Sequence, residues 1–226
     1  DTVDRLGRAA VELLNRDGFT GLTVRRVAAE AGVGAATAYT YFSSKEHLAG
    51  EVFWRSISRD NITTWYGRTR ASRIVDPSDP TRIFRWLICE SHDDKGNAAA
   101  YTYKAEDSSQ VERTAAHERN RSDVSRSANR YLKRISYGNT VPYFADLTST
   151  QPDSLPNQWL FELVFDYGEH DALAPTPLEV APWPARPDAF SSYRAGFELR
   201  TYRLCRRILM FHRFAELGDA ACLVRS

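Results

Sequence analysis

The segment from Gly32 to Phe42, GVGAATAYTYF, gathers hydroxyl side chains on one short stretch of the chain. These side chains belong to Thr37, Tyr39, Thr40 and Tyr41. Each hydroxyl can both donate and accept a hydrogen bond, so the group suits a surface of phosphates and base edges. Two near-adjacent tyrosines on a short helix of alanine and threonine cannot both be buried. The segment therefore predicts an exposed polar surface that contacts nucleic acid.

A second polar group, DYGEHD, contains Asp166, Glu169, His170 and Asp171 directly after an apolar stretch. Carboxylates beside a histidine are the residue types of an acid/base or metal site. A polar hairpin end contains the same residues, and this is the interpretation we favour. The choice between the two depends on which other side chains reach the group.

Three arginines lie near the C-terminus: Arg203, Arg206 and Arg207. They could bind an anion together or form ion pairs with acidic residues on neighbouring strands, and we favour the ion pairs. The chain has no spacing typical of a Ser/His/Asp or Cys/His nucleophile, a phosphate loop or a dinucleotide fingerprint. We therefore expect no catalytic residue, no metal, no cofactor and no enzymatic activity.

The charge balance gives no global attraction to nucleic acid. The 226 residues have a net charge of +1, and residues 1–56 contain seven Lys+Arg and seven Asp+Glu. Any contact with DNA must come from local placement of charges. No apolar run approaches the roughly 18 residues that span a membrane, and no signal peptide is present. We expect a cytoplasmic location.

The first 56 residues have apolar residues at helical spacing. They predict helices over Val3–Asp17, ended by Gly18, and Val24–Ala31, capped by Thr23 and closed by Gly32. A third helix is expected from Gly34 or Ala35, before an inward-facing Phe42. A fourth should begin at Ser43, which has capping-box spacing to Glu46, and continue through Leu48, Val52 and Phe53.

Residues 3–56 resemble the N-terminal domain of TetR-family repressors. The string AAVELLNRDGFTGLTVRRVAAEAGVGAATAYTYFSSKEHL carries the resemblance. It implies that the third helix enters the major groove of duplex DNA, with Thr37 and Thr40 at base edges. The other residues that it implies in DNA binding lie at the phosphate backbone: Thr23, Arg25, Arg26, Tyr39, Tyr41 and Lys45.

The character of the chain changes near residue 56. All ten prolines lie at or after Pro77, and apolar residues mostly alternate there, which predicts strands. The expected strands are 62–67, 83–90, 99–105, 131–137, 159–167, 197–214 (as one long strand or two) and 222–225. The 83–90 and 99–105 strands should form a hairpin around Gly96. Residues 108–130 should form a long polar loop or a partly disordered insert.

Residues 57–226 resemble the middle region of the insecticidal toxin complex B component and Salmonella plasmid virulence B protein family. The strings include DPSDPTRIFRWLICESHDDKGNAAAYTYKAED, WLFELVFDYGEHD and DAFSSYRAGFELRTYRLCRRILMFHRF. The resemblance implies a non-catalytic part of a large β-rich shell that encloses a separate toxic domain. It also implies other toxin-complex components as partners, and a toxin parent exported without a classical signal peptide.

The sequence thus predicts an α+β chain of two units. Residues 1–56 form a helix-turn-helix bundle of three or four helices, and residues 57–226 an incomplete antiparallel β-rich domain. The function expected is sequence-specific DNA binding of the repressor type, fused to a toxin-shell scaffold segment. The alternative is a toxin B-component fragment whose helix-turn-helix is an unselected fusion without a regulatory role, since nothing after residue 56 predicts the helical dimerisation domain of such repressors.

Overall fold

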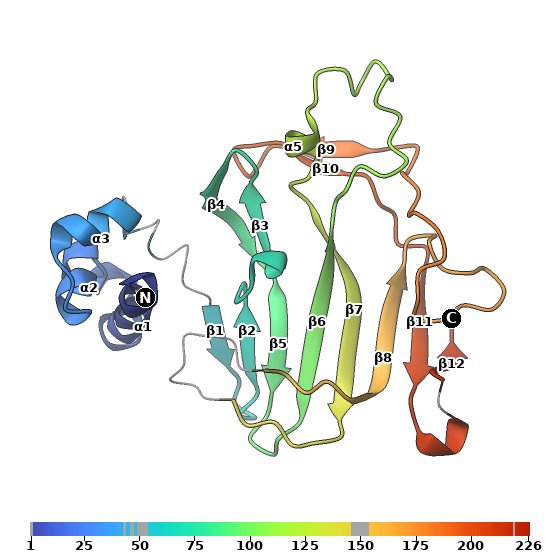
Figure 1. Ribbon diagram of the computed structural model, residues 1–226, viewed down its shortest axis with the longest axis horizontal. Helices are drawn as coiled ribbons and strands as arrows, with labels where there is room; N and C mark the ends of the chain where they lie inside the picture. The colour runs from blue at the N-terminus through green and yellow to red at the C-terminus, as the bar shows by residue number, and fades with distance from the viewer. Residues whose placement is uncertain (1, 43, 46–47, 49–53, 146–153, 219) are drawn as a thin grey trace.

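Helices form the N-terminal part of the protein, and strands form most of the rest (Figure 1). The computed structural model describes residues 2–42, 44–45, 48, 54–145, 154–218 and 220–226. The fold is α+β with a mostly antiparallel sheet, as the sequence predicts at this coarse level. No helix among the described residues combines the length and the apolar character that a membrane crossing requires.

Three helices precede the sheet: α1 (Thr2–Gly21), α2 (Val24–Glu30) and α3 (Ala35–Tyr41). The regular part of α1 ends where the sequence predicts, because Gly18 adopts a φ of 69°, which a residue with a Cβ rarely adopts. The hydroxyl of Thr23 caps α2 by accepting a hydrogen bond from the backbone N–H of Arg26 at 3.2 Å. The fourth helix expected from Ser43 lies mainly outside the described residues.

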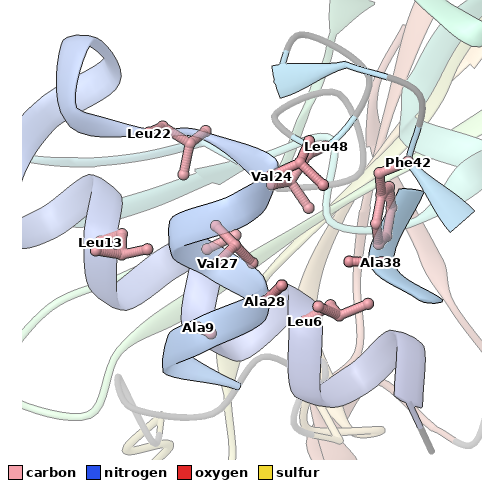
Figure 2. Packing of buried hydrophobic residues seen from close by; sticks show 11 residues of the cluster. Leu6, Ala9, Leu13, Leu22, Val24, Val27, Ala28, Ala38, Phe42 and Leu48 are labelled. Atoms are coloured by element: carbon pink, nitrogen blue, oxygen red, sulfur yellow. The ribbon is translucent and has the colours of Figure 1, made fainter. Parts of the chain in front are cut away.

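The helices share a small apolar core, which Figure 2 shows from close by. Leu6 and Leu13 from α1, Val27 from α2 and Ala38 from α3 are fully buried in it. Phe42 and Leu48 complete the cluster after α3. Only Ala38 of α3 reaches this core, because the other residues of that helix are exposed. The core thus leaves the surface of α3 open to solvent.

The main sheet has eight strands in the order β1-β2-β5-β6-β7-β8-β11-β12, and each strand pairs antiparallel with its neighbours. Two small two-stranded sheets accompany it, β3–β4 and β9–β10. The strands are β1 (Trp54–Ile57), β2 (Thr63–Tyr66), β3 (Arg73–Asp76), β4 (Asp79–Trp86), β5 (Ile88–His92), β6 (Ala98–Ala105), β7 (Arg130–Asn139), β8 (Trp159–Asp166), β9 (Phe190–Ser192), β10 (Leu199–Thr201), β11 (Arg207–His212) and β12 (Cys222–Arg225).

The strand predicted over 83–90 is two strands. The strand is interrupted at Leu87. Its backbone N–H donates to the Ser72 carbonyl, and its own carbonyl accepts from the Gly67 N–H, and neither bond belongs to a strand ladder. Consequently β4 pairs with β3, while β5 joins the main sheet. The predicted hairpin across Gly96 is present between β5 and β6.

The long strand predicted over 197–214 is also divided, in this case between two different sheets. β10 pairs with β9, and β11 pairs with β8 and β12. The separating segment is held in place by tertiary hydrogen bonds. The N–H of Tyr202 donates to the Tyr131 hydroxyl at 2.9 Å, and the N–H of Arg206 donates to the Asp166 carbonyl at 2.8 Å.

Residues 108–130 are an ordered part of the structure, which fits the long loop of the prediction and not its alternative, a partly disordered insert. This loop contains two short elements, a 3-10-like run of turns and α5 (Asp123–Arg126). Its anchor is Glu118, which is 1% exposed and accepts hydrogen bonds from Arg126, Arg200 and Tyr202. The polar composition of this segment suggested a solvated loop. Ion pairs between residues so far apart in the chain cannot be read from a local sequence pattern.

Candidate functional site

The residues expected to bind DNA lie on the helical part of the chain, and nearly all are exposed. Those on or before α2 are Thr23, Arg25 and Arg26, and those on α3 are Thr37, Tyr39, Thr40 and Tyr41. The two tyrosines are 45% and 44% exposed, although aromatic side chains of this size usually bury most of their surface. The hydroxyl group of Thr40 donates to the carbonyl of Ala36 at 3.2 Å.

Arg26 is bonded within the protein. Its Nη1 donates to the Gly21 carbonyl at 2.6 Å, and its Nη2 forms an ion pair with Asp17. Desolvation raises the pKa of Asp17, but hydrogen bonds from Arg26 and Arg16 outweigh it and leave that pKa below its ordinary value. Arg26 therefore braces α2 against the end of α1 in this structure.

Lys45 follows α3 and is half-buried. Its ammonium lies 4.7 Å from the centroid of the Phe19 ring, a distance typical of a cation–π contact. Phe19 is itself 43% exposed, so this contact leaves the ammonium near the surface. The structure thus places the eight predicted residues on one small helical unit.

The polar group predicted at 166–171 is a buried cluster at the end of β8. One ligand-type atom from each of Asp166, Glu169 and His170 lies within 4.8 Å of the others, and all three residues are buried. Asp171 does not join them. It is exposed, and its carboxylate accepts the backbone N–H groups of Leu173 and Ala174 at 2.8 Å each.

Lys133 of β7 reaches into this cluster, and sequence reasoning missed it. Its ammonium forms an ion pair with Glu169, lies 2.7 Å from His170 Nε2 and donates to the Phe165 carbonyl at 3.1 Å. His170 Nδ1 lies 2.9 Å from the Thr176 carbonyl, which can only accept, so Nδ1 carries the proton and Nε2 accepts from Lys133. No local sequence pattern links Lys133 to this cluster, because residue 133 lies more than 30 positions before it along the chain.

Arg207 neutralises the remaining carboxylate of the cluster. Its Nε donates to Asp166 Oδ2 at 2.6 Å. Desolvation raises the pKa of Asp166, but hydrogen bonds from Arg207 and from the N–H groups of Gly168 and His170 outweigh it, so the pKa is lowered. Lys133 and Arg207 thus supply the positive charges that face these carboxylates, and the arrangement fits a structural polar cluster. It lies at the end of β8 before the long connection to β9, and not at the hairpin end that the sequence favours.

Arg203 forms a second buried ion pair, with Glu106, but neither residue lies in a strand, so this pairing is not across a sheet as predicted. Arg207 of β11 does pair across the sheet, with Asp166 of β8. The Arg203 and Glu106 side chains both have 0% exposure. The guanidinium of Arg203 also lies 4.3 Å from the centroid of Trp183, and Lys104 lies 4.4 Å from that same ring. The buried indole thus contacts two cations. These contacts fasten the segment before β9 to the loop after β6.

Comparison with known proteins identifies a family over most of the chain, a range that includes α2 and α3 as well as most of the strands. The family model described as Salmonella virulence plasmid 65kDa B protein (SpvB) matches residues 18–214. The chain belongs to the SpvB family. Mono(ADP-ribosyl)transferase SpvB of Salmonella typhimurium is 40% identical over 179 residues, which are 77% of this chain and 29% of that protein. The chain therefore spans less than a third of the length of this relative.

Solved structures agree with this membership. The N-terminal domain of effector protein SpvB from Salmonella typhimurium strain LT2 matches with a TM-score of 0.68 and 42% identity, over 76% of this chain and 53% of that one. The TcdB2-TccC3 crystal structure matches with a TM-score of 0.67 and 33% identity, over 76% of this chain and 8% of that one. The sheet thus has the fold of toxin-complex proteins.

A shorter likeness concerns regulators. The uncharacterized HTH-type transcriptional regulator Rv0767c of Mycobacterium tuberculosis is 58% identical over 45 residues, which are 20% of this chain and 21% of that protein. This match is a weak indication of a DNA-binding part, because it covers so little of either chain.

The expectation of no enzymatic activity is contradicted by these comparisons. The Salmonella relatives, which are 40% identical over 77% of this chain, are named mono(ADP-ribosyl)transferases. The prediction failed because it relied on missing motif spacings within a segment that spans 29% of these relatives.

Proposed function

We propose that this chain acts as the β-sheet segment of an SpvB-type toxin component. The observation that carries the proposal is the eight-stranded antiparallel sheet, which matches both the SpvB N-terminal domain and TcdB2-TccC3 at more than 30% identity. This is the alternative function that the sequence left open, and it accounts for far more of the chain than the regulator likeness does.

Buried ion pairs support a structural role for the sheet. Lys133 with Glu169, Arg203 with Glu106, and Glu118 with its arginines each join a strand to a distant loop. Such pairs add little net stability, but breaking one is costly, so they favour a single arrangement of the loops. A rigid sheet with fixed loops suits a protein that must hold other domains in place.

We propose other toxin-complex components as partners of the segment, because the similar crystal structure is that of TcdB2 together with TccC3. We further propose that a parent protein containing this segment transfers ADP-ribose, as the name of the Salmonella relatives states. In that parent the present segment would support the transferase structurally.

A graft into the Salmonella SpvB N-terminal domain tests the proposal. Residues 54–214 of this chain replace the matched segment, and the domain lacking that segment serves as the control. The graft should be soluble and unfold in one cooperative transition, whereas the deletion should not. A graft that behaves like the deletion would contradict the structural equivalence.

DNA binding by the helices is a second candidate function. It is favoured by the exposure of Tyr39 and Tyr41 beside the buried Ala38, together with the regulator likeness. In this candidate, residues 1–56 form a separate helix-turn-helix unit. Its DNA-contacting residues are Thr23, Arg25, Arg26, Thr37, Tyr39, Thr40, Tyr41 and Lys45.

Fluorescence anisotropy with labelled duplex DNA tests this candidate at several salt concentrations. Tyr41→Ala and Lys45→Ala should weaken binding, and loss of one phosphate contact should lower the salt slope by about 1. Arg8→Ala, which removes an exposed charge from α1, is the matched control. Binding that is absent, or unchanged in both variants, would leave the helices as a fusion without a regulatory role.

A further inference from the structure

One face of the main sheet is apolar across four neighbouring strands. The register places Ala99, Tyr137, Phe161 and His212 in one cross-strand row and Tyr101, Ile135, Leu163 and Met210 in the next. Directly opposed residues, and residues two apart along a strand, lie on the same side of a sheet. We call these eight residues the aromatic face.

The two sides of the sheet differ in burial. None of the eight residues of the aromatic face is buried; each remains partly exposed. On the opposite side Val164, Leu209 and Phe211 all have 0% exposure. Along β8 and β11 the aromatic face is therefore the more accessible side, although each of its residues is partly buried.

The aromatic face carries no charged side chain, and several of its rings pack against one another. It contains no Lys, Arg, Asp or Glu. The Tyr137 and Phe161 rings stack with centroids 5.0 Å apart, and the His212 ring meets Phe161 edge-on at 5.0 Å. Gly138 allows this packing, because a Cβ there would lie 2.5 Å from Phe161 Cδ2. An apolar patch of this kind marks a site of association.

His212 adds one polar ring nitrogen to the aromatic face. Its Nε2 is buried, and within the described residues it has no hydrogen-bond partner. A buried polar atom without a partner costs free energy unless another molecule supplies one. Because this nitrogen is enclosed and the ring packs edge-on against Phe161 and Phe214, the aromatic face fits a largely apolar partner.

We propose that the aromatic face packs against the portion of an SpvB-type N-terminal domain that this chain does not span. The chain covers 53% of the solved Salmonella domain, so nearly half of that domain is available as the second layer. A sheet with one apolar face requires such a layer to bury it. The inference rests on the proposed toxin-segment function and names the surface through which the segment would assemble.

Complex formation in trans tests the inference. The whole 226-residue chain is mixed with the unmatched portion of the Salmonella SpvB N-terminal domain, and light scattering after size exclusion gives the mass. We expect a one-to-one complex that Leu163→Lys weakens about tenfold or more, since an ammonium would be buried without a partner. Thr102→Lys, at an exposed position on the other side of β6, is the matched control and should retain the complex.

Met210 provides a readout that needs no variant, because it is the only methionine in the chain. Mass spectrometry after mild peroxide treatment follows its oxidation, which should slow on complex formation. Circular dichroism verifies that Leu163→Lys and the unmatched Salmonella portion are both folded before they are mixed. Unchanged oxidation in a formed complex, or binding that Leu163→Lys leaves intact, would overturn the inference.

Two other outcomes separate this inference from the proposed function. If no trans complex forms while the graft folds cooperatively, the toxin segment stands and the aromatic face is not its interface. A homodimer of the chain that Leu163→Lys dissociates would likewise overturn the proposed partner in favour of a second copy. If the graft also fails, the proposed function itself is contradicted.

Discussion

The ammonium of Lys133 lies 2.7 Å from Nε2 of His170, although 37 positions separate the two residues along the chain. Lys133 is 7% exposed and also pairs with Glu169, which is fully buried. β7 and β8 are neighbours in the sheet, so this contact fastens the loop after β8 to the adjacent strand. A group that resembled an acid/base or metal site is thereby explained as a structural cluster.

Removal of Lys133 should therefore destabilise the sheet. We expect Lys133→Met to lower the free energy of unfolding by about 3–5 kcal/mol, because it leaves Glu169 charged and buried without its partner. Urea unfolding followed by tryptophan fluorescence measures the effect. Lys95→Met, at an exposed turn position, should change stability by less than about 0.5 kcal/mol. A double change of Lys133→Met with Glu169→Gln should recover part of the loss.

The stability of the β-rich part should fall in acid because of Asp166. Its pKa in the folded protein lies below the ordinary value of 3.8, so its contribution is complete above that value and is lost as the pH falls through the folded pKa. Arg207→Gln should lower stability at neutral pH and make the acid dependence shallower. Free energies of unfolding measured between neutral and acidic pH test both parts, and an unchanged pH profile would contradict the Arg207 contact.

Glu118 should control the order of the 108–130 loop. We expect Glu118→Gln to cost about 3–5 kcal/mol, since Arg126 and Arg200 would remain buried without their common carboxylate. Hydrogen exchange across residues 106–130 should rise in this variant. Glu112→Gln, which changes an exposed carboxylate in the same loop, should leave the exchange pattern of the wild type.

The helical unit should unfold separately from the sheet if the proposed boundary near residue 56 is right. Leu13 is fully buried in the helical core, so Leu13→Ala should cost that unit about 2–5 kcal/mol. Helical circular dichroism should then melt earlier, while the tryptophan signal of the sheet stays unchanged. Glu12→Ala, on the exposed side of α1, is the control. A joint shift of both signals would contradict independent units.

Local signals allowed the helices and the β5–β6 hairpin to be predicted. Gly18, Thr23 and Gly32 act through their own backbone or through neighbours within a few residues, and such effects are visible in a sequence. The Asp93 carboxylate that accepts the N–H groups of Lys95 and Asn97 is equally local. Those elements therefore appear where the residue types place them.

Long-range contacts explain what the sequence did not predict. Lys133 meets Glu169 across 36 positions, and Arg200 meets Glu118 across 82. No periodicity links such residues, so the buried clusters and the contacts that hold the 108–130 loop were not foreseen. Alternation in β8 identified two faces but could not indicate that Glu162, Val164 and Asp166 form the buried one.

The most direct test of the toxin-segment function is assembly with TccC3. Residues 54–214 replace the matched segment of TcdB2, and the purified chimaera is mixed with TccC3 and separated by size exclusion. The proposed function predicts co-elution in the proportions of the parent TcdB2-TccC3 complex. A chimaera that folds, as judged by circular dichroism, but leaves TccC3 free would contradict it.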